Sequence, residues 1–324
     1  MAELILNLPG IEGSDPSSLP GDLSDALRKA RYSGHRTGDP LASVLGCAAL
    51  PAPAVLSALG TGIDPGVRHW LRFDVVRMIP DLTAVWIDRP LRFDFDAPAS
   101  AALRRELTEL LASEGLSEGV HLADGFGLIS LHSAAECRFS GLDAAQGGRL
   151  DERLPEGPDA SRWRRLITAS QMLLHRYRAL DRADQAGAGL WFWGAGALVP
   201  PLPATSALRV VDDFGSATVR GLGRWLGAEP GPGIRPDAEW PERTLACLPL
   251  EQADPGAALR ELVDNRLQPA MRALRDGRLR RVTVVGSAGV WRLGRAHRIA
   301  FWRRAVRGLH PGADLRSAGS RVVA

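Results

Sequence analysis

One run of residues constrains the fold of this chain more than any other: LWFWGAGALVPPLP, over Leu190–Pro203. Aromatic and apolar residues that stop at Gly194 predict a buried strand, and Gly196 permits either a positive φ or a close approach of another backbone segment. Because ligands of α/β sheets bind beyond the ends of strands, we place a candidate ligand cleft near Trp193, Gly194 and Gly196. The alternative interpretation is that Trp191 and Trp193 serve only as core residues.

Strand and helix patterns alternate along most of the chain. Apolar runs predict strands in the N-terminal MAELILN and over residues 207–211, 245–250, 282–285 and 290–293. Helical periodicity covers residues 22–30, 159–178, 214–226 and 257–275. This alternation predicts an α/β fold with a mixed, mostly parallel sheet at its core.

A smaller α+β module interrupts the alternation. Trp70–Ile87 predicts two strands joined by a tight turn, Pro98–Ser113 predicts a helix, and another pair of strands follows. We therefore expect residues 1–66 and 186–324 to form an α/β core lobe. Residues 67–185, including the long amphipathic helix, are expected to form the inserted α+β module.

The N-terminus predicts a cytoplasmic protein. It has no basic region, and its apolar run breaks at Asn7 and Pro9, which favours a first strand over a signal peptide. Residues 41–63 contain no charged side chain and match the length of a membrane span. The segment is rich in Ala, Gly and Ser and is interrupted by Pro51 and Pro53, so it predicts a buried loop and short helix instead. We expect no membrane association.

Residue types that bind metals are sparse. The three cysteines lie about a hundred residues apart, and none of the seven histidines is spaced as a ligand partner of a carboxylate. His35, in SGHRTGD, matches a metal-binding pattern only by chance in our interpretation. We therefore expect no metal and no cofactor.

Two adjacent aspartates follow a predicted strand. Asp212 and Asp213 can either hold Mg²⁺ beside a phosphate or cap the helix that begins near Phe214, and we prefer the cap. His175 lies late in the long amphipathic helix, where a cation interacts favourably with the helix dipole. All three residues are nevertheless included in the candidate ligand cleft.

Charge is distributed unevenly along the chain. Residues 271–324 carry thirteen arginines and two aspartates, a net charge of +11, whereas the first 270 residues carry 27 basic and 35 acidic residues, a net charge of −8. Arginines interleave with aromatic residues there, which suits stacking on single-stranded nucleic acid. The candidate anion-binding residues are Arg292, Arg295, Arg298, Arg303 and Arg304. We prefer the alternative that this end packs against the acidic remainder, and nucleic-acid binding is not expected.

Four segments in order resemble one bacterial family: WLRFDVVRM, RLPEGPDASRWRRLITASQMLLH, LWFWGAGALVP and RIAFWRR. They are similar to RpfE-type regulatory proteins, a family related to archaeal-type, cofactor-independent phosphoglycerate mutases. The resemblance begins near Trp70. It departs from the family pattern at Val75 and Arg77, and at the HRYR stretch, which keeps His175 but lacks an asparagine that is common there.

The resemblance implies a mutase-like scaffold, and such mutases transfer phosphate through a serine nucleophile beside two divalent metals held by Asp and His. No serine here lies in a G-x-S-x-G turn, and no phosphate-binding glycine loop is present, so no catalytic residue is assigned. The favoured hypothesis is a non-catalytic relative with a regulatory role that binds a protein partner or a metabolite. The alternatives are a metal-dependent phosphomutase or phosphatase, and nucleic-acid binding through the basic C-terminal region.

Overall fold

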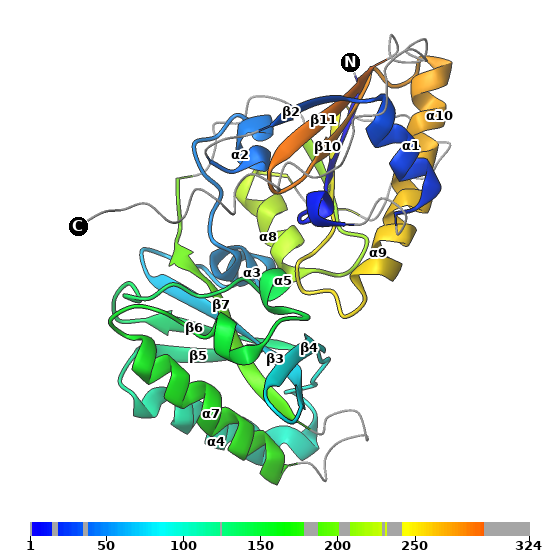
Figure 1. Ribbon diagram of the computed structural model, residues 1–324. Helices are drawn as coiled ribbons and strands as arrows, with labels where there is room; N and C mark the ends of the chain where they lie inside the picture. Colours follow the sequence, from blue (N-terminus) through cyan, green and yellow to red (C-terminus); the bar gives the residue numbers. More distant parts are fainter. Residues whose placement is uncertain are drawn as a thin grey trace, which may run out of the picture.

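The computed structural model describes residues 2–14, 19–34, 38–123, 125–177, 187–200, 208–228, 231 and 242–294. Within these ranges the chain forms two β-sheets, each with its own helices (Figure 1). The predicted α/β class with a mixed, mostly parallel core sheet is confirmed.

The first sheet has six strands in the order β2-β11-β10-β1-β9-β8. Four of them are parallel: β1 (Glu3–Asn7), β8 (Leu208–Val211), β9 (Arg243–Cys247) and β10 (Arg281–Val285). β11 (Gly289–Gly294) and β2 (Arg31–Gly34) add antiparallel pairs at one edge. The central strand β1 is buried on both faces, which explains why Leu4, Ile5 and Leu6 read as a continuous apolar run.

Helices cover both faces of the first sheet (Figure 1). One core contains residues of α1 (Gly21–Lys29) and of a continuous helical segment made of α9 (Pro255–Leu262), a π-helical turn at Val263–Leu267 and α10 (Gln268–Asp276). The other core contains residues of α2 (Pro40–Leu45), α3 (Pro53–Thr61) and α8 (Ala217–Trp225). None of the helices in the described residues has the length and apolar character that crossing a membrane requires.

The second sheet is antiparallel and is built around the long strand β3 (His69–Pro80). β3 pairs with β4 (Val85–Pro90), β6 (Phe126–Leu131) and β7 (Ala188–Ala197), and β5 (Ser117–Ala123) pairs with β6. Two helices, α4 (Ala101–Ser113) and α7 (Ala160–Arg176), pack together on this sheet (Figure 1). The short helices α5 (Leu142–Ala145) and α6 (Leu150–Arg153) connect β6 to α7.

The tryptophan strand β7 belongs to the second sheet, which corrects its expected place in the core lobe of residues 186–324. Its aromatic side chains pack with those of β3 and α7, as in the contact of Phe192 with Phe73 and Trp163. α3 packs against both α8 and β7, so this helix lies between the two sheets. We call the junction formed by α3, α8, β3 and β7 the interlobe seam.

Candidate functional site

A charged pair is buried in the interlobe seam. Arg72 and Asp74 lie on β3, and their side chains are only 2% and 5% exposed. Residues two apart on a strand face the same side of a sheet, so Arg72 can form a bidentate pair with Asp74, with both N–O distances at 2.8 Å. The ion pair offsets the cost of removing both charges from water.

Side chains from other elements surround the same guanidinium group. Its Nη1 donates to Ser57 Oγ on α3 at 2.9 Å and to Thr218 Oγ1 on α8 at 3.0 Å. Oε1 of Glu251, in the loop after β9, lies 3.6 Å from Nη1. We refer to Arg72, Asp74, Ser57, Thr218 and Glu251 as the Arg72 cluster. Through the side chain of Arg72, this cluster links β3 of the second sheet with α3, α8 and the loop after β9.

Aromatic rings complete the surroundings of Arg72. The Cζ atom lies 4.1 Å from the centroid of the Phe126 ring and 5.1 Å from that of Trp193, distances at which cation–π attraction operates. Trp193 Nε1 also donates to Asp74 Oδ2 at 2.6 Å. Burial alone would lower the pKa of Arg72, but the charges of Asp74 and Glu251 and their hydrogen bonds raise it above its ordinary value. The guanidinium is therefore held in its charged form.

The carboxylate of Glu251 lies beside the N-terminal end of α8. The Ser216 hydroxyl, at the N-cap position, donates to Oε1 of Glu251 at 2.6 Å and accepts from Val219 N at 3.2 Å. The positive end of a helix dipole favours a carboxylate there. Oε2 of the same side chain is buried and has no hydrogen-bond partner among the described residues. Such an unsatisfied buried acceptor is uncommon in proteins.

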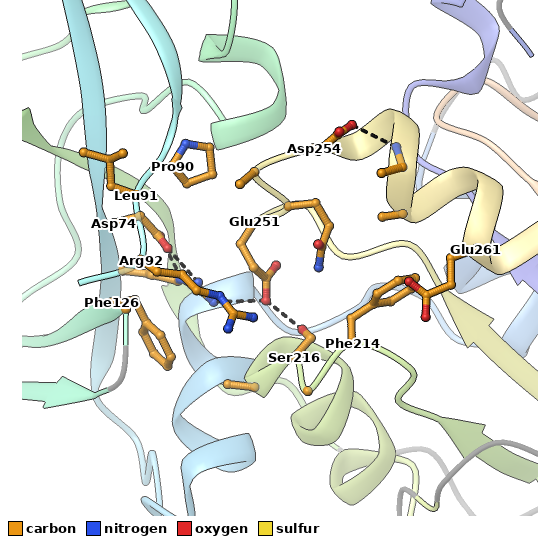
Figure 2. Close-up of a pocket in the computed structure, with 18 residues that line it drawn as sticks. Asp74, Pro90, Leu91, Arg92, Phe126, Phe214, Ser216, Glu251, Asp254 and Glu261 are labelled. Atoms are coloured by element: carbon orange, nitrogen blue, oxygen red, sulfur yellow. Dashed lines mark hydrogen bonds and ion pairs between the residues drawn. The ribbon is translucent and has the colours of Figure 1, made fainter. Parts of the chain in front are cut away.

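A cavity of about 320 Å³ lies beside the Arg72 cluster, and Figure 2 shows the side chains that line it. We call it the seam pocket, because its walls come from β3, β4, the start of β6, the N-terminal end of α8, the Glu251 loop and α9. The charged lining residues are two arginines and four carboxylates: Arg72, Arg92, Asp74, Glu251, Asp254 and Glu261. Phe126, Phe214, Pro90 and Leu91 provide apolar surface. The pocket is large enough for a small metabolite and has an excess of negative charge.

The structure gives the glycines of the tryptophan strand a packing role. Gly194 has a φ of +69°, and a Cβ on it would lie 2.9 Å from Pro53 Cβ. A Cβ on Gly196 would lie 2.6 Å from Ala52 Cβ. Both glycines therefore let the start of α3 approach β7 closely. Of the three residues proposed from this strand, only Trp193 touches the Arg72 cluster, and none lines the seam pocket.

The two adjacent aspartates are held by arginines. Asp212 accepts from Ser216 N at 2.8 Å and pairs with Arg220 Nη1 at 3.2 Å. Asp213 makes a bidentate ion pair with Arg266 of the π-helical turn. The expected capping role needs correction, because the N-cap of α8 is Ser216, although Asp212 does bind its backbone N–H. With these partners, the two carboxylates do not fit the role of ligands for the mutase metals.

The strand ends of the first sheet border a second cavity, of about 480 Å³. Asn7, Cys247 and Ser287 line it where β1, β9 and β10 end. Burial raises the pKa of Cys247 to about 12, so this thiol stays protonated. In the part of the chain that the structure describes, no three His, Cys, Asp or Glu residues come together as a metal site. Among the described residues, the donors at these strand ends therefore do not fit two divalent metals.

The remaining sequence candidates lie apart from the seam. His175 is exposed near the end of α7 and lines a groove between α4 and α7. Arg292 lies on β11, opposite Thr283 of β10. Arg295, Arg298, Arg303 and Arg304 lie outside the described residues, as does His35. The structure thus does not bring His175 together with Trp193 or with the aspartates.

Sequence reasoning missed Arg72, Asp74 and Glu251. A signal for the first two was present, because WLRFDVV places a basic and an acidic residue two positions apart inside an apolar run. A strand that buries both faces must pair such charges. Glu251 carried no comparable signal, since it reaches the cluster from a loop far along the chain.

Comparison with known proteins gives structural neighbours only. No protein-family model and no curated protein matches the chain. The fold is similar to that of the cofactor-independent phosphoglycerate mutase from Thermoplasma acidophilum, with a TM-score of 0.39 and 14% identity over 90% of this chain and 89% of that one. It is also similar to the PH0037 protein from Pyrococcus horikoshii, with a TM-score of 0.45 and 11% identity over 90% of this chain and 87% of that one.

Proposed function

We propose that this protein is a non-catalytic, phosphoglycerate mutase-like protein of the RpfE type that binds a small metabolite in the seam pocket. The observation that carries the proposal is a cavity of about 320 Å³ that receives residues from both sheets and is lined by the buried pair of Arg72 and Asp74 together with Glu251. A cavity that combines a few charged groups with apolar surface is the usual form of a small-molecule site.

Two features support a binding role over phosphoryl transfer. Asp212 and Asp213, the carboxylates best placed by sequence to hold a metal, are engaged by Arg220 and Arg266. The seam pocket also has more carboxylates than arginines, which disfavours a phosphorylated substrate unless metal ions neutralise it.

The position of the pocket supports a regulatory role. A ligand there contacts residues of both sheets at once, so its binding stabilises one arrangement of the two sheets relative to others. A protein partner that contacts both sheets would then bind the ligand-free and ligand-bound forms with different affinity. We propose that this ligand-dependent binding of a protein partner takes place in the cytoplasm.

A ligand screen with a blocked pocket tests the binding role. Ala257 is exposed on α9 and lines the seam pocket, so Ala257→Trp fills the cavity without changing the core. The matched control is Ala112→Trp, on the exposed face of α4. Metabolites of positive, negative and zero charge are screened by thermal shift against the three proteins.

We expect at least one compound to raise the melting temperature of the wild type and of Ala112→Trp while leaving Ala257→Trp unchanged. The binding role fails if no compound stabilises the wild type, or if every stabilising compound acts equally on Ala257→Trp.

A further inference from the structure

Three arginines lie on one face of the first sheet, on the neighbouring strands β2, β11 and β10 (Figure 1). Arg31 of β2 is directly opposite Arg292 of β11, and Arg292 is directly opposite Thr283 of β10. Arg281 lies two residues before Thr283 on the same strand, so its side chain leaves the sheet on the same side. We call Arg31, Arg281 and Arg292 the arginine patch.

The patch contains a cross-strand pair of like charges. Residues directly opposite in an antiparallel pair have Cβ atoms about 5 Å apart, and like charges at such positions destabilise a sheet. In the part of the chain that the structure describes, neither Arg31 nor Arg292 has a hydrogen-bond or ion-pair partner. The nearest acidic group on this face, Glu3, lies 3.9 Å from Arg281 and is shared with Arg243 at 3.7 Å. The two central arginines therefore repel each other without a carboxylate to compensate them.

The surroundings of the patch add positive charge. Residues 28–31 and 278–281 read RKAR and RLRR, and they lead into β2 and β10. Both strands are antiparallel to β11, so the two basic runs meet at the same end of the sheet. Asp25 and Asp276 each pair with one arginine of these runs. The basic side chains still outnumber the carboxylates there, and the local field attracts anions.

The neighbouring aromatic rings face away from the patch. On β2, Tyr32 directly follows Arg31. On β11, Trp291 directly precedes Arg292, so strand alternation places both rings on the opposite face of the sheet. These two rings contact each other at a centroid distance of 4.8 Å and pack with the core that contains α1 and α10. The patch thus presents guanidinium groups without the stacking surface that single-stranded nucleic-acid sites use.

The chemistry of the patch matches a phosphate group. A guanidinium group stays charged and presents a fork of N–H donors that fits phosphate oxygens. A phosphate monoester carries between one and two negative charges at neutral pH, so one such group between two arginines turns their repulsion into attraction. Arg31 is exposed and Arg292 is half-buried, which leaves the patch open to a ligand from solvent.

We propose that the arginine patch binds the phosphate group of a small phosphorylated molecule, held between Arg31 and Arg292 with Arg281 as a third donor. The site lies apart from the seam pocket, and phosphate binding there does not depend on the proposed function. The phosphate is bound without being transferred.

Calorimetric titration of the full-length protein tests the site. The probes are glycerol 3-phosphate, inorganic phosphate, glycerol and a thymidine oligonucleotide, all at one ionic strength set with sodium chloride. The proteins are the wild type, Arg31→Gln, Arg292→Gln and the control Arg272→Gln. Arg272 is an exposed arginine of α10 outside the patch, so each variant removes one positive charge.

We expect both phosphate compounds to bind the wild type and glycerol not to bind. Arg31→Gln and Arg292→Gln should each weaken phosphate binding by about tenfold or more, and Arg272→Gln by no more than about threefold, because a distant exposed charge is screened. Equal weakening in all three variants would show general attraction to a basic surface and overturn the site, as would the absence of phosphate binding to the wild type. An oligonucleotide that binds at least about tenfold more tightly than glycerol 3-phosphate, and loses this in both patch variants, would overturn the small ligand in favour of a nucleic-acid backbone.

Melting temperatures without ligand separate a binding role from a structural one. Because the like charges repel each other, Arg31→Gln and Arg292→Gln should each melt at a higher temperature than the wild type. Added phosphate should then raise the melting temperature of the wild type and of Arg272→Gln but not of the two patch variants. A lower melting temperature of both patch variants would show that these arginines stabilise the sheet, and it would overturn the proposal.

Discussion

Arg72 is a charge held inside the protein, and its effect on stability depends on the groups around it. Its partners within the cluster all act through side chains: Asp74, Ser57, Thr218 and, at 3.6 Å, Glu251. Removing the guanidinium would leave the carboxylate of Asp74 buried, with Trp193 Nε1 as its remaining side-chain hydrogen-bond donor among the described residues. Breaking a buried pair from one side costs more than the pair contributes when it is intact.

Arg72→Met should therefore destabilise the fold by about 3–5 kcal/mol. Asp74→Asn should also destabilise the wild type, because it weakens the pair. In the Arg72→Met background the same Asp74→Asn change should instead recover about 1–2 kcal/mol, since it removes an unpaired buried charge. Urea unfolding of the four proteins measures this reversal of sign, and an Asp74→Asn effect of the same size in both backgrounds would contradict the coupling.

Part of the Arg72 cluster could be found from the sequence. Sequence reasoning singled out Trp193, which does contact the cluster, and it quoted the WLRFDVV run that contains Arg72 and Asp74. It did not assign these two charges a role, because a local pattern does not show whether both faces of a strand are buried. Glu251 could not be found, since its position depends on how the loop after β9 packs against α8.

At the scale of elements, the seam depends on a close approach of α3 and α8. A Cβ on Gly60 of α3 would lie 1.8 Å from Ala217 O, and a Cβ on Gly221 of α8 would lie 1.7 Å from Leu56 O. Glycine is required at both positions because no heavier atom fits against the facing backbone. This contact also places Ser57 and Thr218, on the same two helices, within 3.1 Å of each other beside Arg72.

Gly221→Ala should lower the free energy of unfolding by about 3 kcal/mol, because the added methyl group forces the two helices apart. Gly21→Ala is the matched control, since Gly21 starts α1 and a Cβ there meets nothing within 4 Å. That control should change stability by less than about 1 kcal/mol, towards greater stability if at all. Thermal unfolding compares the two, and equal effects would show that the helix contact tolerates separation.

The elements themselves followed from periodicity, whereas their pairing did not. Five strands of the first sheet, including the β10–β11 hairpin, and the long helix α7 lie close to their predicted ranges, whereas the edge strand β2 was not predicted. β7 was predicted as a strand but assigned to the wrong sheet, because an apolar run does not specify which distant strand it pairs with. Likewise, Gly196 signalled a positive φ or a close approach of another segment, and only the fold shows that the start of α3 is what approaches.

At the scale of the whole molecule, the chain combines a mostly parallel sheet with an antiparallel one, and the seam pocket receives residues from both. Strand ends of the first sheet, where α/β proteins commonly place their chemistry, carry Asn7, Cys247 and ion-paired aspartates. We therefore assign ligand binding to the seam pocket and no phosphoryl transfer to the strand ends of the first sheet. Sequence alone predicted a non-catalytic relative with its ligand near Trp193, and of the residues named from that strand only Trp193 contacts the Arg72 cluster.

The most direct test of this central claim is a turnover measurement on purified protein supplied with Mn²⁺, Mg²⁺ and Zn²⁺. With 3-phosphoglycerate and p-nitrophenyl phosphate as substrates, we predict no mutase or phosphatase rate above the protein-free blank and no metal retained in stoichiometric amount after desalting. A metal-dependent rate that is lost in both Asp212→Asn and Asp213→Asn would contradict the account, because it would make these ion-paired carboxylates metal ligands in a working enzyme.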